Sequence, residues 1–393
     1  MASTNHELPS GLRVAIVHDY LTQRGGAERA VLAMLRAFPQ ASLHTSVYDP
    51  HGTFAEFAAA DVRVLPINRV VLLRRRPRFA FPVLARSFSS STVAADVVLC
   101  SSSGWAHGVR AHGRKIVYCH APARWLYEPE RYFGRSGSKA ARLALAALRS
   151  RLRRWDLDAA RSAVRYLVPS ETARAKVLAA YGIDAAVVHA PPGLPAEGAV
   201  RPVEGVEPGF FLCVARLLPY KNVDAVIRAF AALPGKRLLV VGTGPEERSL
   251  RRIAPANVRL LGAVDDATLR WLYGNAVAAV SAAYDDYGLV PLEAASFGRP
   301  CVALRADGLL ETVVEGTTGL FFDRPEPAAV RAAVEAAAGR VFDEHALRAH
   351  AERFSEERFG VRLRSAVAKA LAERPTRGTP TGWRISPSSS ARA

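Results

Sequence analysis

Cysteine is scarce in this sequence of 393 residues, and the patterns that mark secreted or membrane-spanning chains are missing. No Cys-x-x-Cys pair occurs, and all the cysteines lie in or beside apolar runs: Cys100, Cys119, Cys213 and Cys301. This usage predicts reduced core residues of a cytosolic protein. The first residues lack the basic and then apolar order of a signal peptide, and no apolar run reaches the roughly 18 residues of a spanning helix. We therefore expect a cytoplasmic protein, soluble or peripheral at the inner face of a membrane.

Acidic residues are also in the minority, with 36 Asp and Glu against 53 Lys and Arg and a formal net charge of +17. Most of the excess lies in residues 1–200, which contain 27 basic and 14 acidic residues. A basic half favours an anionic partner, such as nucleic acid, a membrane surface or a phosphorylated substrate, whereas a solvated Arg-rich surface is the alternative. Because the sequence has no recognition-helix, RNA-stacking or zinc-finger motif, we expect no nucleic acid partner.

Short apolar runs that end in small or polar residues alternate with helical stretches along most of the chain. This alternation predicts parallel, doubly wound sheets of the α/β class, with a ligand site at the carboxyl ends of the strands. The predicted strands lie within residues 13–20, 96–103, 115–122, 165–170, 210–217, 237–244, 258–264, 277–283 and 300–306.

The chain is long enough for two domains, and a Pro- and Gly-rich segment at residues 190–209 predicts the linker between them. We expect two Rossmann-like domains facing across a cleft, at residues 12–195 and 203–350. Residues 351–372 are predicted to form helices that pack back toward the first domain, and residues 373–393 a disordered tail.

The stretch YDDYGLVPLEAASFGRP, residues 284–300, predicts a strand end, a glycine turn and a short helix. The free N–H groups at the helix start favour a diphosphate, and Gly288 lets backbone approach it closely. Glu293, placed in the first turn of this helix, is suited to accept hydrogen bonds from a diol, and Asp285 to hold sugar hydroxyls. An ordinary helix acid and an ordinary turn residue are the alternatives.

The stretch VARLLPYKNVD places Arg216 and Lys221 just after a predicted strand. Two cations there are suited to neutralise a diphosphate leaving group, although an ordinary solvated loop has the same composition. The nearby glycine turn VVGTGPEE, residues 240–247, lacks the third glycine of the dinucleotide-binding fingerprint.

Taken together and in order, six stretches of the sequence resemble the family 4 (group 1) glycosyltransferases, retaining enzymes of the GT-B fold. The resemblance covers about residues 12–370, and its nearest subgroup is that of mannosyltransferases in cell-surface polysaccharide pathways. The stretches are VHDYLTQRGGAERAVLAMLRAFP, IVYCHAPARWLYE, VARLLPYKNVDAVIRAF, VVGTGPE, VRLLGAVDDATLRWLY, and YDDYGLVPLEAASFGRPCVA with the following GLLETVVEGTTGLFF.

The resemblance implies that the second domain binds a sugar nucleotide. Arg216 and Lys221 match the cationic pair on the donor phosphates, and Glu293 matches the carboxylate that takes the ribose hydroxyls. Asp285 occupies a position where the family usually has Glu, which keeps the charge on a shorter side chain. The predicted donor-binding set also includes the helix start: Gly288, Leu289 and Val290.

In the first domain, Gly25 and Gly26 match a glycine loop that faces the donor diphosphate and the acceptor. His120 matches a histidine near the transferred sugar, and we predict a catalytic role for it beside Arg216, Lys221 and Asp285. A structural histidine at a strand end is the alternative. His18 and Asp19 also end a strand at the expected cleft.

The implied activity is retaining transfer of a hexose, with mannose from GDP-mannose favoured, from a nucleoside diphosphate sugar to a hydroxyl of a glycan or polyprenyl-linked acceptor. No Asp-x-Asp motif follows a strand, so we expect neither a metal nor another cofactor. The basic, apolar segments 70–88 and 148–155 suit an anionic membrane surface. The alternatives are a nucleotide-sugar epimerase of the same fold, a UDP-sugar-dependent transferase on a soluble small molecule, and a catalytically inactive sugar-nucleotide binder.

Overall fold

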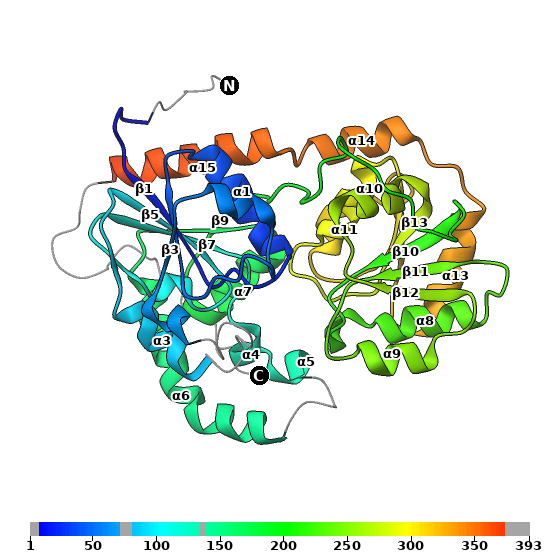
Figure 1. Cartoon of the computed structure of the whole chain (residues 1–393), viewed down its shortest axis with the longest axis horizontal. Helices are drawn as coiled ribbons and strands as arrows, with labels where there is room; N and C mark the ends of the chain where they lie inside the picture. Colours follow the sequence, from blue (N-terminus) through cyan, green and yellow to red (C-terminus); the bar gives the residue numbers. More distant parts are fainter. Residues whose placement is uncertain (1–7, 71–80, 134–138, 374–393) are drawn as a thin grey trace, which may run out of the picture. The chain divides into compact units, whose positions relative to one another are not determined.

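The computed structural model describes residues 8–70, 81–133 and 139–373, which fall into two compact units (Figure 1). Of the described residues, unit 1 comprises 8–70, 81–127, 139–189 and 360–373, and unit 2 comprises 128–133 and 190–359. Each unit contains its own parallel sheet covered by helices, so the α/β prediction is confirmed. The predicted tail lies outside the described residues, except for Glu373.

Unit 1 is built on a seven-stranded parallel sheet of order β3-β2-β1-β5-β7-β8-β9. The central strands are short apolar runs whose residues are almost all buried, because helices cover both faces of a parallel sheet. The strands are β1 (Val14–His18), β2 (Ser42–Thr45), β3 (Val62–Val64), β5 (Val97–Ser102), β7 (Arg114–Cys119), β8 (Arg165–Val168) and β9 (Ala186–Val187); β4 (Thr92–Val93) and β6 (Arg110–Ala111) form a separate pair.

Helix α7 of unit 1 begins and ends at residues that satisfy free backbone groups or relieve backbone strain. It starts where the Ser170 hydroxyl accepts a hydrogen bond from Ala173 N at 2.9 Å and ends at Gly182, whose φ is +70°. The helices of unit 1 are α1 (Gly26–Ala37), α3 (Phe81–Ser89), α4 (Arg124–Tyr127), α6 (Lys139–Arg161) and α7 (Glu171–Tyr181), with the shorter turns η1 (Ala55–Ala59), η2 (Pro66–Arg69) and η4 (Ala106–Gly108); α15 (Glu356–Ala372) crosses from unit 2 into unit 1.

Unit 2 is built on a six-stranded parallel sheet of order β12-β11-β10-β13-β14-β15. The strands are β10 (Phe210–Val214), β11 (Leu238–Val241), β12 (Val258–Gly262), β13 (Ala276–Ser281), β14 (Cys301–Leu304) and β15 (Gly319–Phe322). All nine strands predicted from the apolar runs are confirmed, and the strands that were not predicted are short or lie at sheet edges: β2, β3, β4, β6, β9 and β15.

Helices cover both faces of the unit 2 sheet, as a doubly wound fold requires (Figure 1). Helix α8 packs against α9 and α13, whereas α11 packs against α12 and α14. The helices are α5 (Pro129–Phe133), α8 (Val223–Ala231), α9 (Glu247–Ile253), α10 (Asp266–Asn275), α11 (Leu289–Ser296), α12 (Leu309–Thr312), α13 (Pro327–Ala338) and α14 (Glu344–Glu352), with the turn η5 (Pro219–Lys221).

The segment predicted as a linker contains neither helix nor strand, and it is fastened to unit 2. Tyr287 Oη donates to Ala190 O at 2.6 Å, and Arg270 donates to Pro195 O at 3.0 Å and to Ala199 O at 3.3 Å. The main segment of unit 2 therefore begins at Ala190, earlier in the chain than the predicted domain start at residue 203.

The glycine turn after β11 lies against the loop that follows β10. Gly242 has φ +129°, and a Cβ placed on it would lie 1.9 Å from Ala215 O. A Cβ on Gly244 would lie 2.3 Å from Leu217 O. The two loops also share a hydrogen bond from Leu217 N to Thr243 O at 2.9 Å. These two glycines, which do not form a dinucleotide-binding fingerprint, therefore have a packing role. They allow the turn to lie against the loop that contains Arg216.

Replacing Gly242 with Ala is expected to lower the free energy of unfolding by roughly 2–4 kcal/mol, because it combines a strained φ with a backbone clash. Urea or guanidinium denaturation of the variant measures this loss. Gly235→Ala is the matched control, since no atom lies within 4 Å of its added Cβ and its φ is ordinary. Equal stability of the two variants would contradict the packing role of Gly242.

Candidate functional site

Polar side chains gather in unit 2 where two neighbouring strands end. Arg216 follows β10 and Asp285 follows β13, and these strands pair directly in the sheet. Tyr284 N donates to Tyr220 O at 3.0 Å, which ties the loop after β13 to η5. We call Arg216, Lys221, Asp285, Glu293 and the start of α11 the unit 2 cluster.

The loop after β10 turns sharply at Asn222, whose φ is +48°. Its side-chain amide donates to Ala282 O at 2.8 Å, and Lys221 immediately precedes it at the end of η5. Arg216 Nη2 donates to Tyr220 Oη at 3.2 Å, and Lys221 Nζ lies 5.5 Å from the centre of the Tyr220 ring. Both predicted cations therefore lie around one tyrosine at the strand end.

Lys221 and Asp285, predicted independently as site residues, contact each other. Lys221 Nζ donates to Asp285 Oδ1 at 2.5 Å, and their side chains are 15% and 19% exposed. An ion pair this well shielded from water is stronger than a surface pair. It holds the lysine at the strand end before any ligand is present.

Helix α11 starts at Leu289, and Gly288 before it has φ +81°. A Cβ on Gly288 would lie 2.8 Å from Leu309 Cδ2 and 2.9 Å from Thr312 Oγ1, so packing against α12 also requires glycine here. The N–H groups of Leu289 and Val290 have no acceptor within the helix, because they belong to its first turn. They provide the positive end of the helix that was predicted for an anion.

Glu293 was predicted in the first turn of this helix, and that prediction was wrong. The helix begins two residues before Pro291, so Glu293 lies beyond its first turn. A partner that sequence analysis did not identify orients it: Tyr273 Oη donates to Glu293 Oε2 at 2.8 Å. Burial and then the Glu293 carboxylate raise the pKa of Tyr273 well above its ordinary value, so its hydroxyl stays protonated and donates.

Arg131 is a further cation that sequence analysis missed at this end of the unit 2 sheet. It lies on α5, with its guanidinium 4.7 Å from the centre of the Tyr284 ring and Nη1 3.8 Å from Asp307 Oδ2. Asp307 has φ +50°, a conformation that glycine adopts without strain and aspartate tolerates. No sequence signal marked Arg131, because it precedes the unit 2 strands by a long stretch of chain that belongs to unit 1.

In unit 1, the glycine loop before α1 covers a buried carboxylate. Gly25 caps the helix and Gly26 begins it, and Glu28 in its first turn is only 1% exposed. A Cβ on Gly25 would lie 2.7 Å from Glu28 Oε2, so this glycine leaves room for the carboxylate. Gln23 Nε2 donates to Glu28 Oε1 at 3.0 Å. The motif GGAE thus contains a functional candidate, Glu28, that sequence analysis did not single out.

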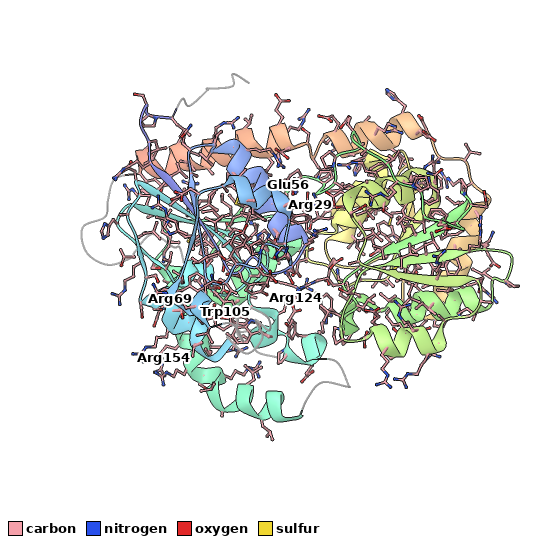
Figure 2. All side chains as sticks on the ribbon, viewed as in Figure 1. Arg29, Glu56, Arg69, Trp105, Arg124 and Arg154 are labelled. Carbon is pink, nitrogen blue, oxygen red and sulfur yellow. The ribbon has the colours of Figure 1, made fainter. Side chains whose placement is uncertain are left out.

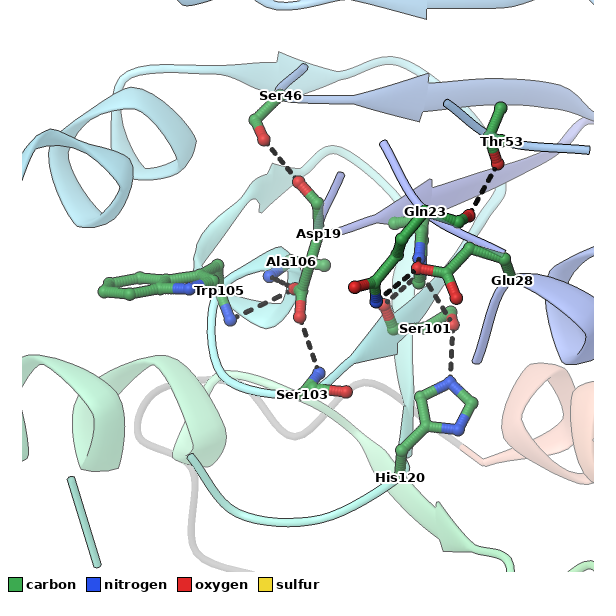
Figure 3. A network of polar contacts seen from close by, with 11 residues as sticks. Asp19, Gln23, Glu28, Ser46, Thr53, Ser101, Ser103, Trp105, Ala106 and His120 are labelled. Atoms are coloured by element: carbon green, nitrogen blue, oxygen red, sulfur yellow. Dashed lines mark hydrogen bonds and ion pairs between the residues drawn. The ribbon is translucent and has the colours of Figure 1, made fainter. Parts of the chain in front are cut away.

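His18 and His120 belong to one polar network at the ends of β1, β5 and β7. Figure 3 labels Glu28, Ser101 and His120 of this network. His18 Nδ1 lies 3.1 Å from Ser101 O and 3.0 Å from Ser101 Oγ, and His18 Nε2 lies 3.6 Å from Glu28 Oε1. Ser101 Oγ lies 2.8 Å from His120 Nε2. We call His18, Glu28, Ser101 and His120 the unit 1 network.

The histidines of this network have opposite pKa shifts. Burial alone would lower the pKa of His18, but the contact with Glu28 outweighs burial and raises it. Burial alone would raise the pKa of Glu28, but the contact with His18 lowers it. Burial and then the charge of His18 lower the pKa of His120 to about 3. The network therefore combines a buried ion pair with a neutral imidazole.

Asp19 was predicted beside the site, and the structure gives it a supporting role. Its Oδ2 accepts from Ser103 N at 2.7 Å, and its Oδ1 accepts from Trp105 N at 3.1 Å and Ala106 N at 2.6 Å (Figure 3). These bonds fix the loop after β5 and place the buried Trp105 (Figure 2), which stacks on Trp125 with ring centres 4.7 Å apart. Asp19 thus anchors the loop that follows Ser101.

Comparison with known families covers both halves of the chain. Residues 24–197 match the family described as Glycosyltransferase Family 4, and residues 200–346 match the family described as Glycosyl transferases group 1. The two matches together include the glycine loop, the unit 2 cluster and three members of the unit 1 network: Glu28, Ser101 and His120.

Curated relatives share a part of their length with this chain. A glycogen synthase of Thermus thermophilus is 36% identical over 140 residues, which is 34% of this chain and 32% of the relative. A GDP-mannose-dependent alpha-(1-6)-phosphatidylinositol monomannoside mannosyltransferase of Mycolicibacterium smegmatis is 30% identical over 221 residues, 48% of this chain and 56% of the relative. The chain therefore spans about a third to just over half of the length of these relatives.

Solved structures share the fold over about nine tenths of this chain. HepE of Anabaena, in complex with UDP and glucose, is 17% identical with a TM-score of 0.67, over 91% of this chain and 99% of HepE. The sucrose-phosphate synthase of Thermosynechococcus elongatus is 18% identical with a TM-score of 0.67, over 92% of this chain and 99% of that protein. At this identity the likeness concerns the fold, which is the predicted GT-B architecture.

Replacing Asp19 with Ala is expected to lower the free energy of unfolding by about 3 kcal/mol or more, because buried N–H groups lose their acceptor. Denaturant unfolding monitored by tryptophan fluorescence measures this, since the affected loop contains Trp105. Asp61→Ala is the matched control, because the Asp61 side chain forms an exposed ion pair with Arg63 and its loss should change stability by less than about 1 kcal/mol. A stable Asp19→Ala protein would contradict the anchoring role.

Proposed function

The chain belongs to the glycosyltransferases of family 4 (group 1), and we propose that it transfers a hexose from a nucleoside diphosphate sugar to a hydroxyl group of an acceptor. The observation that carries this proposal is the unit 2 cluster, in which Arg216 and Lys221 follow β10, α11 starts after β13, and Lys221 pairs with Asp285 between these paired strands. A diphosphate is the ligand class that such a combination of cations and helix N–H groups suits.

The cations supply the charge that glycosyl transfer requires. As the bond between the sugar and the phosphate breaks, negative charge builds on the leaving phosphate while the sugar becomes oxocarbenium-like. Positive groups that are already in place stabilise this charge without reorganisation. Arg216 is held by Tyr220 and Lys221 by Asp285, so both side chains are oriented before the donor binds. On binding, the phosphate would compete with Asp285 for Lys221 and release the carboxylate toward the sugar hydroxyls.

Glu293 is proposed to accept hydrogen bonds from the ribose hydroxyls of the donor. Its Oε2 already accepts from Tyr273, so the carboxylate is oriented before the donor binds. Asp285 has a short side chain and forms an ion pair with Lys221. These two features favour a role for Asp285 at both the transferred sugar and the phosphate. Gly25 and Gly26 are proposed to keep the first turn of α1 open to the donor diphosphate, and His120 is proposed to donate a hydrogen bond to the transferred sugar.

Mannose is the favoured sugar and GDP-mannose the favoured donor. The support is the name of the mycobacterial relative, which is a GDP-mannose-dependent mannosyltransferase. We propose retention of configuration, by attack of the acceptor hydroxyl on the face from which the phosphate departs, with the phosphate taking the proton. We also propose that the reaction needs no metal, because Arg216, Lys221 and the helix start would neutralise the diphosphate. A UDP-sugar donor is the second candidate.

The acceptor is proposed to be a glycan or a polyprenyl-linked molecule at an anionic membrane surface. Helix α6 supports this proposal, because exposed leucines lie among its arginines: Leu143 is 73% exposed and Leu148 is 41% exposed, and Arg154 is exposed on the same helix (Figure 2). Part of the other basic segment, residues 71–80, lies outside the described residues. Within the described ranges, no helix has both the length and the apolar character to cross a membrane.

Nucleoside diphosphates should protect the protein from heat, and Glu293→Ala should remove most of that protection. Loss of charged hydrogen bonds to the ribose weakens binding by about 10- to 100-fold, whereas Tyr273→Phe should weaken it by about fivefold. Thermal shift with UDP, GDP and ADP measures this and identifies the base. Glu335→Ala, on the exposed face of α13, is the control. If none of the three nucleotides protects the unmodified protein, the proposed function is wrong.

Replacing Arg216 and Lys221 together with Ala is expected to lower the turnover number by at least about 100-fold, because the leaving phosphate loses its charge stabilisation. Release of nucleoside diphosphate in the presence of acceptor measures the rate. The control replaces Arg228 and Arg248, two exposed cations of the same unit, and should retain the rate. A double variant that retains normal turnover would refute the phosphate assignment, and sugar epimers formed without transfer would favour the epimerase alternative.

A further inference from the structure

The unit 1 network is assembled by the register of the sheet. His18 at the end of β1 lies directly opposite Ser101 on the adjacent strand β5. His120 follows β7, the next strand, and its backbone N–H donates to Ser102 O at 2.9 Å. Glu28 reaches the group from the first turn of α1. His18, Glu28 and Ser101 are all at most 2% exposed, so each proton in the network needs a partner inside the protein.

The distances around His18 locate its protons. Its Nδ1 is 3.1 Å from the carbonyl oxygen of Ser101, which can only accept, so Nδ1 carries a proton. Its Nε2 faces Glu28 Oε1 at 3.6 Å, and a lone pair there would oppose the carboxylate. The pair therefore holds one additional proton, as a His18 imidazolium beside a Glu28 carboxylate. The negative charge of Asp19, the next residue, also favours the protonated form of His18.

The position of these protons determines the hydrogen bond of Ser101. Its hydroxyl oxygen lies 3.0 Å from His18 Nδ1, which is a donor, and 2.8 Å from His120 Nε2. The hydroxyl can accept two hydrogen bonds but has one proton, and because Ser101 is buried this proton needs an acceptor. Since His18 Nδ1 is a donor, the hydroxyl accepts from His18 and donates to His120 Nε2. Nε2 of His120 must then be the unprotonated nitrogen, and the ring proton lies on Nδ1. No hydrogen bond engages Nδ1 of His120 in the described part of the chain.

We infer that His18, Glu28 and Ser101 are positioning residues that hold His120 as the Nδ1–H tautomer, so that it presents a hydrogen-bond donor and not an acceptor. This inference rests on the proposed function, in which the donor would be directed at a hydroxyl of the transferred sugar. Burial, and then the charge on His18, also keep His120 neutral, because both lower the pKa of His120. The ionisable groups that face His120 in this way are His18 on β1 and Glu28 on α1, and the Tyr118 ring packs edge-on against it at 5.2 Å.

The test uses full-length protein with ¹⁵N-labelled histidine and no ligand, so that it does not depend on turnover. Ring-nitrogen NMR signals should show His120 as the Nδ1–H tautomer, without titration between pH 5 and 9, and His18 with both nitrogens protonated at pH 7. Ser101→Ala should shift the His120 signals toward the Nε2–H tautomer. Glu28→Gln, which preserves shape and removes the charge, should leave His18 neutral at pH 7.

Ser102→Ala is the matched control. Ser102 is the next residue on β5, is equally buried, and makes the same kind of bond, from its Oγ to His107 Nδ1 at 2.8 Å. This variant should leave the His120 signals as they are in the unmodified protein. With donor and acceptor present, Ser101→Ala should lower the turnover number about tenfold with little change in donor affinity, which corresponds to one orienting hydrogen bond, and Ser101→Thr should restore most of it.

The outcomes separate this inference from the proposed function. An Nε2–H tautomer for His120 in the unmodified protein, or a tautomer that Ser101→Ala does not alter, would overturn the inference even if the protein proves to be an active transferase. Failure to bind any nucleoside diphosphate would overturn the proposed function, whereas the NMR result would still report the proton positions of the network. A tenfold loss that also appears in Ser102→Ala would reduce Ser101 to a structural role and refute the positioning claim.

Discussion

Both candidate groups depend on the geometry of parallel strands, which brings the loops after neighbouring strands to the same edge of a sheet. In unit 2, pairing of β10 with β13 places the Arg216–Lys221 loop beside the Asp285 loop. In unit 1, pairing of β5 with β1 and β7 places Ser101 beside His18 and close to His120. Residues far apart in sequence become neighbours because the sheet sets their register.

The two groups use charge differently. In unit 2, the ion pair of Lys221 and Asp285 is partly open to water, so an anionic ligand can compete for the lysine. In unit 1, the ion pair of His18 and Glu28 is almost fully buried, so no ligand is expected to exchange with either partner. The first arrangement suits binding and release of a charged leaving group. The second suits a fixed field around a neutral imidazole.

The sequence predicts the strands of the central sheet well, because buried parallel strands are short apolar runs whose ends are marked by small and polar residues. It also identifies Arg216, Lys221 and Asp285, which lie in loops at the expected strand ends. It did not predict that Lys221 and Asp285 pair. The two residues are 64 positions apart in the chain, and local sequence patterns do not report contacts between residues so far apart. It did not single out Glu28 in the pattern GGAE, because only the folded structure shows that this carboxylate is buried.

Stability alone does not explain why a protein keeps an ion pair as buried as that of His18 and Glu28. Removing two charges from water costs several kcal/mol for each ion, and an apolar pair of similar volume is often as stable. The pair does, however, determine which nitrogen of His120 carries the proton. Glu28 fixes the protons of His18, His18 then fixes the direction of the Ser101 hydroxyl, and the hydroxyl fixes the proton of His120. An apolar replacement would leave Ser101 free to rotate and His120 free to exchange tautomers. The cost of burial is therefore best understood as the cost of fixing the direction of one hydrogen bond.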